Sequence, residues 1–434
     1  MIYNKSSIQK LITNFIFMVI LLIFIFGRSF VGLYIFENRL GELIVAVSLL
    51  ASSALFIDKN YKIFGKKIYY LQLLIWLSFL SSLFLNQGSI FEQYTYKSSS
   101  YIWGISYFYL AIFYFRYFEF TKLKIILMNT SLIYVYILST VNYPEKLIKF
   151  FLDYSDKWDF NKAASVALFF IITTLLTNKV FHSNRLIVEY FFFISGMFLP
   201  LFIFKSRGSF IAILIFIIYQ IYRQRKIVFF KDFRTLVVVL TATLITIFST
   251  ITILNQDLET IIETSELQRS FKKLANQKDT KVESFISFYI RDGKLYSIDG
   301  NFNWRIQIWQ DVLFDSISDK KIIFGYGYTE IIPAMNKFER QGDDGENENV
   351  HNFLVNIFAR GGLIQLILFI LFYFNIMFFR KKGNLNPDVI SLCIPVFIIS
   401  FFDVSLENAH FPFLFYFFLS YFFKSNSEYI KIEI

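Results

Sequence analysis

Long apolar runs separated by short polar segments dominate the chain. The runs show no alternation of period two, and most approach the roughly 20 helical residues that cross a hydrocarbon core of about 30 Å. The pattern therefore predicts an all-α polytopic integral membrane protein with about 12 transmembrane helices. The predicted spans are residues 11–27, 40–57, 68–86, 101–118, 124–141, 163–178, 186–204, 208–222, 235–254, 353–379, 388–406 and 410–423.

Two of these spans are less regular. The first follows Lys5 and Lys10, as in a secretory signal peptide. No small-residue cleavage site follows at 27–30, so we predict a retained helix. The span at 208–222 is short for a full crossing of the membrane.

Basic residues follow every second span. They are Lys59, Lys62, Lys66, Lys67, Arg116, Lys122, Lys124, Lys179, Arg185, Arg223, Arg225, Lys226, Lys231, Arg234, Arg380, Lys381 and Lys382. Positive loops stay in the cytoplasm, which predicts that both termini are cytoplasmic. The chain then divides into helices 1–9 over residues 1–254, a large extracytoplasmic helical loop over 255–352, and helices 10–12 over 353–434.

Composition agrees with a membrane protein, at 56% hydrophobic and 18% charged residues. The net charge of +10 is explained mostly by the predicted inner loops, because no basic stripe with interleaved aromatic residues lies outside the membrane. Nucleic-acid binding is therefore excluded. Cys393, the single cysteine, lies in an apolar run, so no disulfide framework exists.

Two outer loops are long enough to fold. In 142–162, apolar residues at helical spacing predict an interfacial helix. The large loop begins with a similar amphipathic pattern over 258–274. An Arg-Asp-Gly sequence at 291–293 then fits either a hairpin turn or a break between helices.

Polar chemistry gathers between Gly300 and Gly362. The sequence NWRIQIWQDVLFDSI predicts a helix on which Arg305 and Trp309, four residues apart, share one face. Its predicted packed side consists of Ile308, Trp309, Val312 and Leu313. Gly325 and Gly327 predict a tight turn, and His351 with Asn352 opens the tenth span at its outer end.

The order Arg-x-x-x-Trp, Gly-x-Gly, an outer loop and then His-Asn before a glycine pair resembles the O-antigen ligase and polymerase superfamily. The family pattern also has an arginine at the outer end of an earlier span, which Arg207 in KSRGSF matches. One departure is Arg360 before the glycine pair, where the family more often has an acidic or neutral residue.

The resemblance implies a GT-C-like membrane enzyme and glycosyl transfer that uses no metal and no cofactor. The implied donor is a saccharide on polyprenyl (undecaprenyl) pyrophosphate. The acceptor is a saccharide hydroxyl on a lipid-linked repeat unit or on lipid A-core. Membrane lipids and a chain-length regulator are further candidate partners. The implied location is the bacterial inner membrane, with the site facing the periplasm or the outside.

The implied chemistry assigns roles to particular residues. Arginine forks bind phosphate oxygens, so Arg305 and Arg207 are the candidate clamps for the departing pyrophosphate. Histidine titrates near neutral pH, so His351 is the candidate general base. The candidate substrate-binding residues are Trp309, Asn352, Gly325, Gly327 and Arg360.

Each assignment has a structural alternative. His351 fits an ordinary polar residue at a helix start, and Arg305 fits a surface residue paired with Asp299 or Glu330. Arg207 fits a helix-end anchor, although it lies on the outer side against the positive-inside trend. The two glycines of the predicted turn fit a purely structural role.

Other polar residues near the predicted site fit less well. Arg360 projects from the helix face opposite His351, so a phosphate contact requires a break at Gly361 and Gly362; snorkelling is the better interpretation. The acidic run at 343–348 fits a solvated loop. His410 and Glu407 face the outer side between the last two spans, and a role for them in the site is the less favoured interpretation. His182 belongs to a cytoplasmic loop and is excluded by its side of the membrane.

The sequence leaves the reaction itself open. Our first interpretation is polymerisation of lipid-linked repeat units into O-antigen or capsule-type polysaccharide, in lipopolysaccharide or polysaccharide biosynthesis. The second is an O-antigen ligase that transfers polymer to lipid A-core. A lipid-linked saccharide flippase is a third, but mid-span charges are few and no internal repeat is visible.

Overall fold

The structure is a computed structural model that describes most of the chain. The described residues are 5–57, 66–115, 120–140, 143–155, 161–182, 185–225, 233–254, 288–341, 347–378 and 385–425. The predicted amphipathic helix at 258–274 lies outside them.

Every predicted span coincides with a helix or a pair of helices. They are α1 (Lys5–Val31), α2 (Leu40–Ile57), α3 (Lys66–Leu85), α5 (Ser100–Gly104) with α6 (Ser106–Phe115), α7 (Lys122–Thr140), α9 (Ala163–Val180), α10 (Arg185–Lys205), α11 (Arg207–Arg223), α13 (Phe233–Leu254), α16 (Phe353–Met377), α17 (Pro387–Phe402) and α18 (His410–Ser425).

Within the described residues, seven helices are long and apolar enough to cross a membrane: α1, α3, α7, α9, α10, α13 and α16. Shorter apolar helices occur at Leu40–Ser53 and Pro387–Phe402. The chain is thus a helical, multi-pass membrane protein, as predicted. The count of about 12 spans and their orientation remain predictions.

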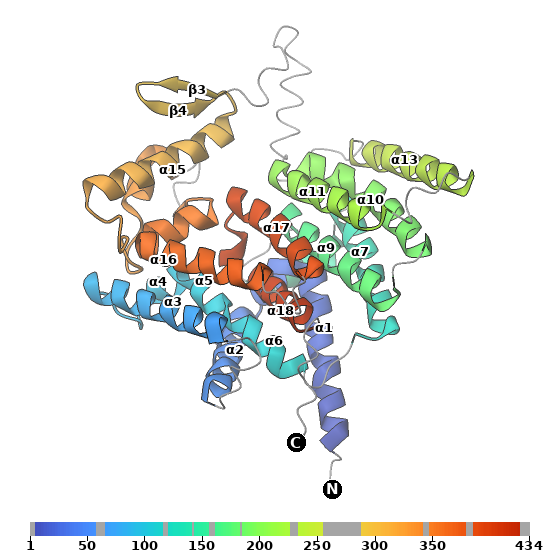
Figure 1. Ribbon diagram of the computed structural model, residues 1–434, viewed down its shortest axis with the longest axis horizontal. Coiled ribbons are helices and arrows are strands. Elements are labelled where there is room, and N and C mark those ends of the chain that lie inside the picture. The colour runs from blue at the N-terminus through green and yellow to red at the C-terminus, as the bar shows by residue number, and fades with distance from the viewer. Residues whose placement is uncertain are drawn as a thin grey trace.

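The bundle is organised around α9, which is buried along most of its length. It contacts α1, α7, α10, α11, α17 and α18. Phe169 of α9 stacks on Phe24 of α1, with ring centroids 3.6 Å apart. In contrast, α13 lies at the edge of the bundle against α10 (Figure 1). It exposes apolar side chains such as Leu244 and Phe248. Apolar exposure of this kind suits contact with lipid tails.

Two short hairpins depart from the all-α prediction. The first joins β1 (Tyr34–Ile35) and β2 (Asn38–Arg39). The second joins β3 (Phe288–Arg291) and β4 (Lys294–Ser297). Asp292 and Gly293 between β3 and β4 have φ of 52° and 74°, which is the left-handed pair that tight hairpins require. The hairpin alternative for Arg-Asp-Gly is therefore correct.

Further helices lie between the long ones. They are α4 (Gln93–Ser98), α8 (Glu145–Tyr154) and α15 (Gly300–Ser318), with 3-10 turns η3 (Pro333–Asn336), η4 (Phe338–Arg340) and η5 (Ser405–Glu407). The helix α8 confirms the helical prediction for 142–162; its Phe151 is buried and its Leu152 exposed.

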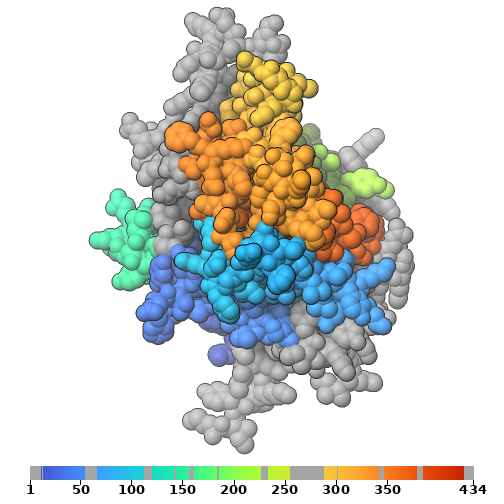
Figure 2. All heavy atoms as spheres, turned by 90° about the vertical axis from the view of Figure 1, so that its left-hand side faces the viewer, coloured from blue at the N-terminus to red at the C-terminus, as the bar shows by residue number. Residues whose placement is uncertain are grey.

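The segment that contains α15 covers one end of the bundle. In Figure 1, α1 begins at the bottom of the view, whereas β3, β4 and α15 lie at the upper left. Figure 2 shows the yellow-to-orange surface of this segment lying above the light-blue surface around α3 and α4. A small core beneath α15 includes Ile308, Val312 and Met335. The segment is therefore a packed unit that rests on the helix ends.

Candidate functional site

Arg207 and the start of α15 are joined by an ion pair. Arg207 is the first residue of α11, and its Nη1 lies 2.5 Å from Asp299 Oδ2. Asp299 also caps α15, because its Oδ1 accepts a hydrogen bond from the Phe302 N–H at 2.8 Å. One carboxylate thus starts α15 and fixes its position relative to α11. Asp299, considered above as a partner of Arg305, pairs with Arg207 instead.

Arg305 reaches the C-terminal end of α17. Its Nη1 donates to the Phe402 carbonyl, where helix carbonyls lack intrahelical partners and carry partial negative charge. Its buried Nε has no hydrogen-bond partner within the described residues. A Cβ added to Gly208 would lie 2.9 Å from the Phe402 Cβ, so the start of α11 also lies against this point. Arg207 and Arg305 therefore flank the end of α17.

Trp309 holds the backbone just before His351. Its Nε1 donates to the Val350 carbonyl at 2.8 Å, and its ring packs against Phe401 at 5.4 Å between centroids. The predicted packed side of α15 is correct for Ile308 and Val312, which are fully buried. It is wrong for Leu313, which is 48% exposed because the buried stripe of α15 is narrower than expected. A contact between Trp309 and a sugar remains a prediction.

His351 has a left-handed backbone with φ of 50°. Such conformations are uncommon outside glycine and occur at functional sites, where the surroundings enforce them. Its Nε2 lies 3.1 Å from Asn347 Oδ1, and its ring lies 5.1 Å from the Trp304 ring. An amide oxygen only accepts hydrogen bonds, so Nε2 carries the proton and Nδ1 holds the lone pair in neutral His351.

The electrostatic surroundings keep His351 neutral. Burial lowers the pKa of His351 to about 4, and the nearby charge of Arg305 acts in the same direction. Lys162 also lowers this pKa, whereas Asp403 raises it. The imidazole is therefore uncharged at neutral pH and able to accept a proton. Asn352 caps α16 through hydrogen bonds from the Leu354 and Val355 N–H groups, at 3.0 and 3.1 Å, and so fixes His351 just ahead of the helix.

The Gly-Tyr-Gly turn inserts into a break in α16. Gly362 has φ of 70°, and the Tyr326 and Gly327 N–H groups donate to the Ala359 and Arg360 carbonyls at 2.8 and 2.9 Å. A Cβ on Gly325 would lie 2.4 Å from the Arg360 oxygen, and one on Gly362 would lie 2.2 Å from the Ile323 oxygen. Only glycine permits backbones to approach this closely. The two glycine pairs thus form one interlocked structure.

Arg360 is part of this interlock and does not snorkel. It is 4% exposed and donates to the Gly327 and Glu330 carbonyls and to the Tyr94 hydroxyl at 2.8 Å. The snorkelling interpretation is wrong because the break at Gly362 lets the loop fold over the arginine. Glu330 likewise contacts Arg360 through its carbonyl and not Arg305 through its carboxylate. Substrate contact by Arg360 stays a prediction from the sequence, and its burial among protein acceptors leads to the competing expectation of a role in the fold.

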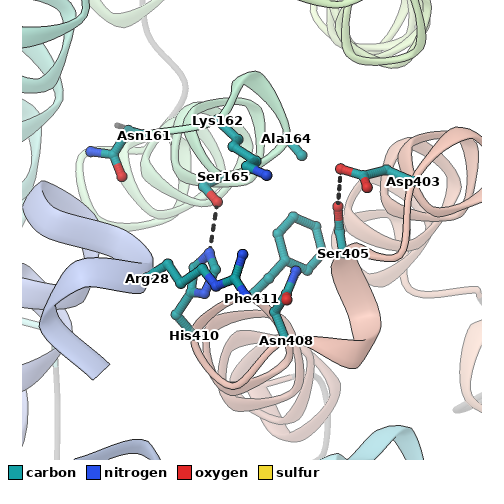
Figure 3. Close-up of a pocket in the computed structure, with 10 residues that line it drawn as sticks. All are labelled: Arg28, Asn161, Lys162, Ala164, Ser165, Asp403, Ser405, Asn408, His410 and Phe411. Atoms are coloured by element: carbon teal, nitrogen blue, oxygen red, sulfur yellow. Dashed lines mark hydrogen bonds between the residues drawn. The ribbon is translucent and has the colours of Figure 1, made fainter. Parts of the chain in front are cut away.

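A polar pocket lies beside these residues, and His410 is the only lining residue considered above as a candidate for the site. It is lined by Arg28, Lys162, Asp403, Ser405 and His410, among others (Figure 3). Arg28 and Lys162 each lie at the predicted outer end of a span, against the positive-inside trend. The same departure from the trend was used above for Arg207 only, although it also marks these two residues. The acidic run contributes little here: Glu348 pairs with Lys97 at 2.6 Å, and 342–346 lie outside the described residues.

The fold and the clustered arginines and histidine define a multi-pass membrane protein with a polar, cationic site where several helices end. A family model described as O-antigen ligase matches residues 191–405, from within α10 to η5. The chain belongs to the O-antigen ligase and polymerase superfamily and is a membrane glycosyltransferase. The matched residues include Arg207, Arg305 and His351. No curated protein matches the chain significantly.

Proposed function

We propose that the protein polymerises polyprenyl-pyrophosphate-linked repeat units into O-antigen or capsule-type polysaccharide, at the outer face of the bacterial inner membrane. The observation that supports this most is the convergence of Arg207, Arg305 and His351. They come from three separate segments. The Asp299 ion pair and the Phe402 carbonyl contact bring Arg207 and Arg305 to the end of α17. His351 lies close enough to Arg305 and Asp403 for their charges to affect its pKa.

The donor's pyrophosphate lies beside Arg305 and Arg207 in this proposal. An acceptor hydroxyl oxygen attacks the anomeric carbon, and the bond from that carbon to the pyrophosphate oxygen breaks. The bonding pair stays on the pyrophosphate, where the arginine charges stabilise it. A hydrogen-bond donor placed where negative charge develops in the transition state raises the rate about 10²–10³-fold. Nδ1 of His351 accepts the hydroxyl proton, because Asn347 holds the proton of Nε2.

The helix ends that form the site support an outward orientation. They are the starts of α11 and α16 and the ends of α10 and α17. The predicted basic loops lie at the opposite ends of these helices. With the basic loops inside, the site faces away from the cytoplasm and its nucleotide sugars. A lipid-linked donor follows from that placement.

An O-antigen ligase is the second candidate function, favoured by the description of the matched family model. The two reactions share the donor and the chemistry described above. They differ in the acceptor, which is a lipid-linked repeat unit for the polymerase and lipid A-core for the ligase.

Deletion of the gene followed by gel analysis of surface glycolipid tests the proposal. A polymerase deletion removes the ladder and leaves a band with one repeat unit. Complete loss, with long polymer accumulating on the lipid carrier, identifies the ligase. Accumulation of single repeat units on the inner leaflet would contradict both the polymerase and the ligase function and would indicate a flippase.

A further inference from the structure

The polar pocket forms where three separate segments meet. Arg28 belongs to the end of α1, Lys162 precedes α9, and Asp403 and His410 flank the connection between α17 and α18 (Figure 3). Arg28, Lys162 and His410 lie outside the residues that the family model matches. The pocket is therefore not explained by the matched region alone.

A kink in α1 builds one wall of this pocket. Gly27 has φ of 52°, and a Cβ there would lie 2.5 Å from Asn161 Oδ1. Asn161 Nδ2 donates to the Ile25 carbonyl, which the kink exposes, at 2.5 Å, and the Tyr143 hydroxyl donates to it at 3.2 Å. The kink is thus held by specific contacts, and it sets the position of Arg28.

Cationic side chains outnumber carboxylates in the pocket. Arg28 and Lys162 supply two positive charges, and Asp403 is the one acidic residue in the lining. Asp403 Oδ2 accepts from the Ser405 hydroxyl at 3.1 Å, and its Oδ1 accepts from the Val404 N–H at 2.8 Å. The lining thus contains two cationic side chains and one carboxylate, a composition that favours an anionic ligand.

Buried polar atoms in the lining lack hydrogen-bond partners. His410 is 6% exposed; its Nε2 lies 3.0 Å from Ser165 Oγ, while its Nδ1 has no partner within the described residues. With the Ser165 hydroxyl donating to Nε2, Nδ1 carries a hydrogen that a ligand oxygen can accept. Buried polar groups are normally paired, so an unpaired one points to a bound group.

The pocket adjoins the catalytic residues but is separate from the donor clamps. Arg305 contacts the backbone at Phe402, and the pocket begins at the next residue, Asp403. Asp403 and Lys162 both act electrostatically on His351. A cavity of about 20 Å³ that is open on one side has room for the oxygens of one phosphate group, but not for a sugar ring.

We propose that this pocket binds a phosphate group of the saccharide acceptor, while Arg207 and Arg305 hold the pyrophosphate of the donor. This inference rests on the proposed function, in which two lipid-linked substrates meet at one base. Two phosphate-bearing groups repel each other, so each needs its own cations. The pocket supplies the second set beside His351.

Calorimetric titration of the full-length protein in neutral phosphatidylcholine nanodiscs, with inorganic pyrophosphate as the probe, tests the pocket. We expect two sites per chain in the unaltered protein. Arg28→Gln combined with Lys162→Gln removes one site, and Arg305→Gln removes the other. Lys149→Gln, an exposed lysine of α8 in the same loop as Lys162, keeps both. Two unchanged sites in the double variant would overturn the proposal.

Two further variants separate a binding defect from a folding defect. Lys162→Gln alone weakens the pocket site at least tenfold, whereas Lys162→Arg, which keeps the charge, binds as the unaltered protein does. The thermal midpoint of each variant reports folding. Equal weakening by both variants, with unchanged thermal midpoints, contradicts an electrostatic role for Lys162.

The source of the phosphate is tested in two ways. In anionic phosphatidylglycerol nanodiscs the pocket site remains if the acceptor is its ligand; its disappearance there assigns the pocket to a bilayer lipid and refutes the proposal. In a transfer assay, Lys162→Gln raises KM for the acceptor alone, and unchanged acceptor KM also refutes it. Normal transfer by Arg305→Gln would instead refute the proposed function. The number of pyrophosphate sites measured by calorimetry would still test the pocket.

Discussion

Two arginines of the same stretch, Arg305 and Arg360, occupy contrasting surroundings. Arg360 is 4% exposed, and its described hydrogen bonds go to two carbonyls and a tyrosine hydroxyl inside the interlocked glycine turns. Arg305 is half-buried, holds one carbonyl at a helix end and lies close enough to His351 to lower its pKa. The same side chain therefore has two environments about 55 residues apart in sequence.

These two environments distinguish an arginine that stabilises the fold from an arginine that is available for the reaction. A buried guanidinium surrounded by protein acceptors stabilises the fold, and its loss leaves unpaired carbonyls. A guanidinium beside a neutral histidine has charge available for a substrate. Changes around Arg305 and His351 are therefore expected to impair transfer, and changes around Arg360 and Gly362 to impair folding.

The largest effect is expected for His351→Ala. Loss of the base lowers the transfer rate about 10²–10⁴-fold, since nothing replaces Nδ1 as proton acceptor. Protein abundance in the membrane stays normal, because the helix cap is Asn352 and not His351. The check is the glycolipid ladder alongside an immunoblot of membranes. A normal ladder removes His351 from the chemistry.

Arg207→Ala is expected to reduce transfer by about 10²–10³-fold if Arg207 contacts the pyrophosphate. Arg207→Lys keeps the charge but loses the fork, and an intermediate rate is expected. Initial rates with saturating donor measure both. Equal activity of the alanine variant and the unaltered protein would show that the ion pair with Asp299 is only structural.

Gly362→Ala is expected to destabilise the protein by about 2–4 kcal/mol. The reasons are the left-handed φ of 70° and the close Ile323 carbonyl. Gly300→Ala is the matched control, because no heavy atom lies within 4 Å of its added Cβ. Thermal unfolding in detergent measures both variants. Equal midpoints for the two would contradict the interlock between the turn and α16.

Asn347→Ala is expected to lower kcat about 10–100-fold by releasing the orientation of His351. Asn347→Asp keeps an acceptor for Nε2–H and adds negative charge, so it raises the pKa of His351 and moves the acid limb of the rate profile upward. A change in stability alone does not move that limb. An unmoved limb in the aspartate variant rules out contact between these side chains during turnover.

The pH profile gives the smallest but most specific signal. The pKa of His351 is lowered to about 4. The imidazole is therefore neutral above that pH, and below it the ring is protonated and cannot act as a base. The acid limb of kcat/KM is expected well below 6.5, the ordinary histidine value. Bound pyrophosphate adds negative charge near Arg305 and raises this pKa, so the limb of kcat lies higher. A kcat/KM limb at 6.5 contradicts the burial of His351.

Helix positions were predictable from the sequence because apolar runs of membrane length have few alternative structures. The motif residues were predictable as a set, and the hairpin was predictable as one of two alternatives. The contacts that these residues make were not predictable. The pairing of Arg207 with Asp299 joins residues 92 positions apart, and the pocket joins residues from opposite ends of the chain. Periodicity reports which face of a helix is apolar, but not which helix ends meet.

Transfer per folded molecule, measured in parallel for Arg305→Ala and Arg360→Ala, tests the central claim most directly. Our account predicts normal abundance and a rate reduced about 10²–10³-fold for Arg305→Ala. It predicts low abundance and a normal rate per folded molecule for Arg360→Ala. A normal rate for Arg305→Ala, or an equal loss of rate per folded molecule in both variants, would contradict the division between site and scaffold.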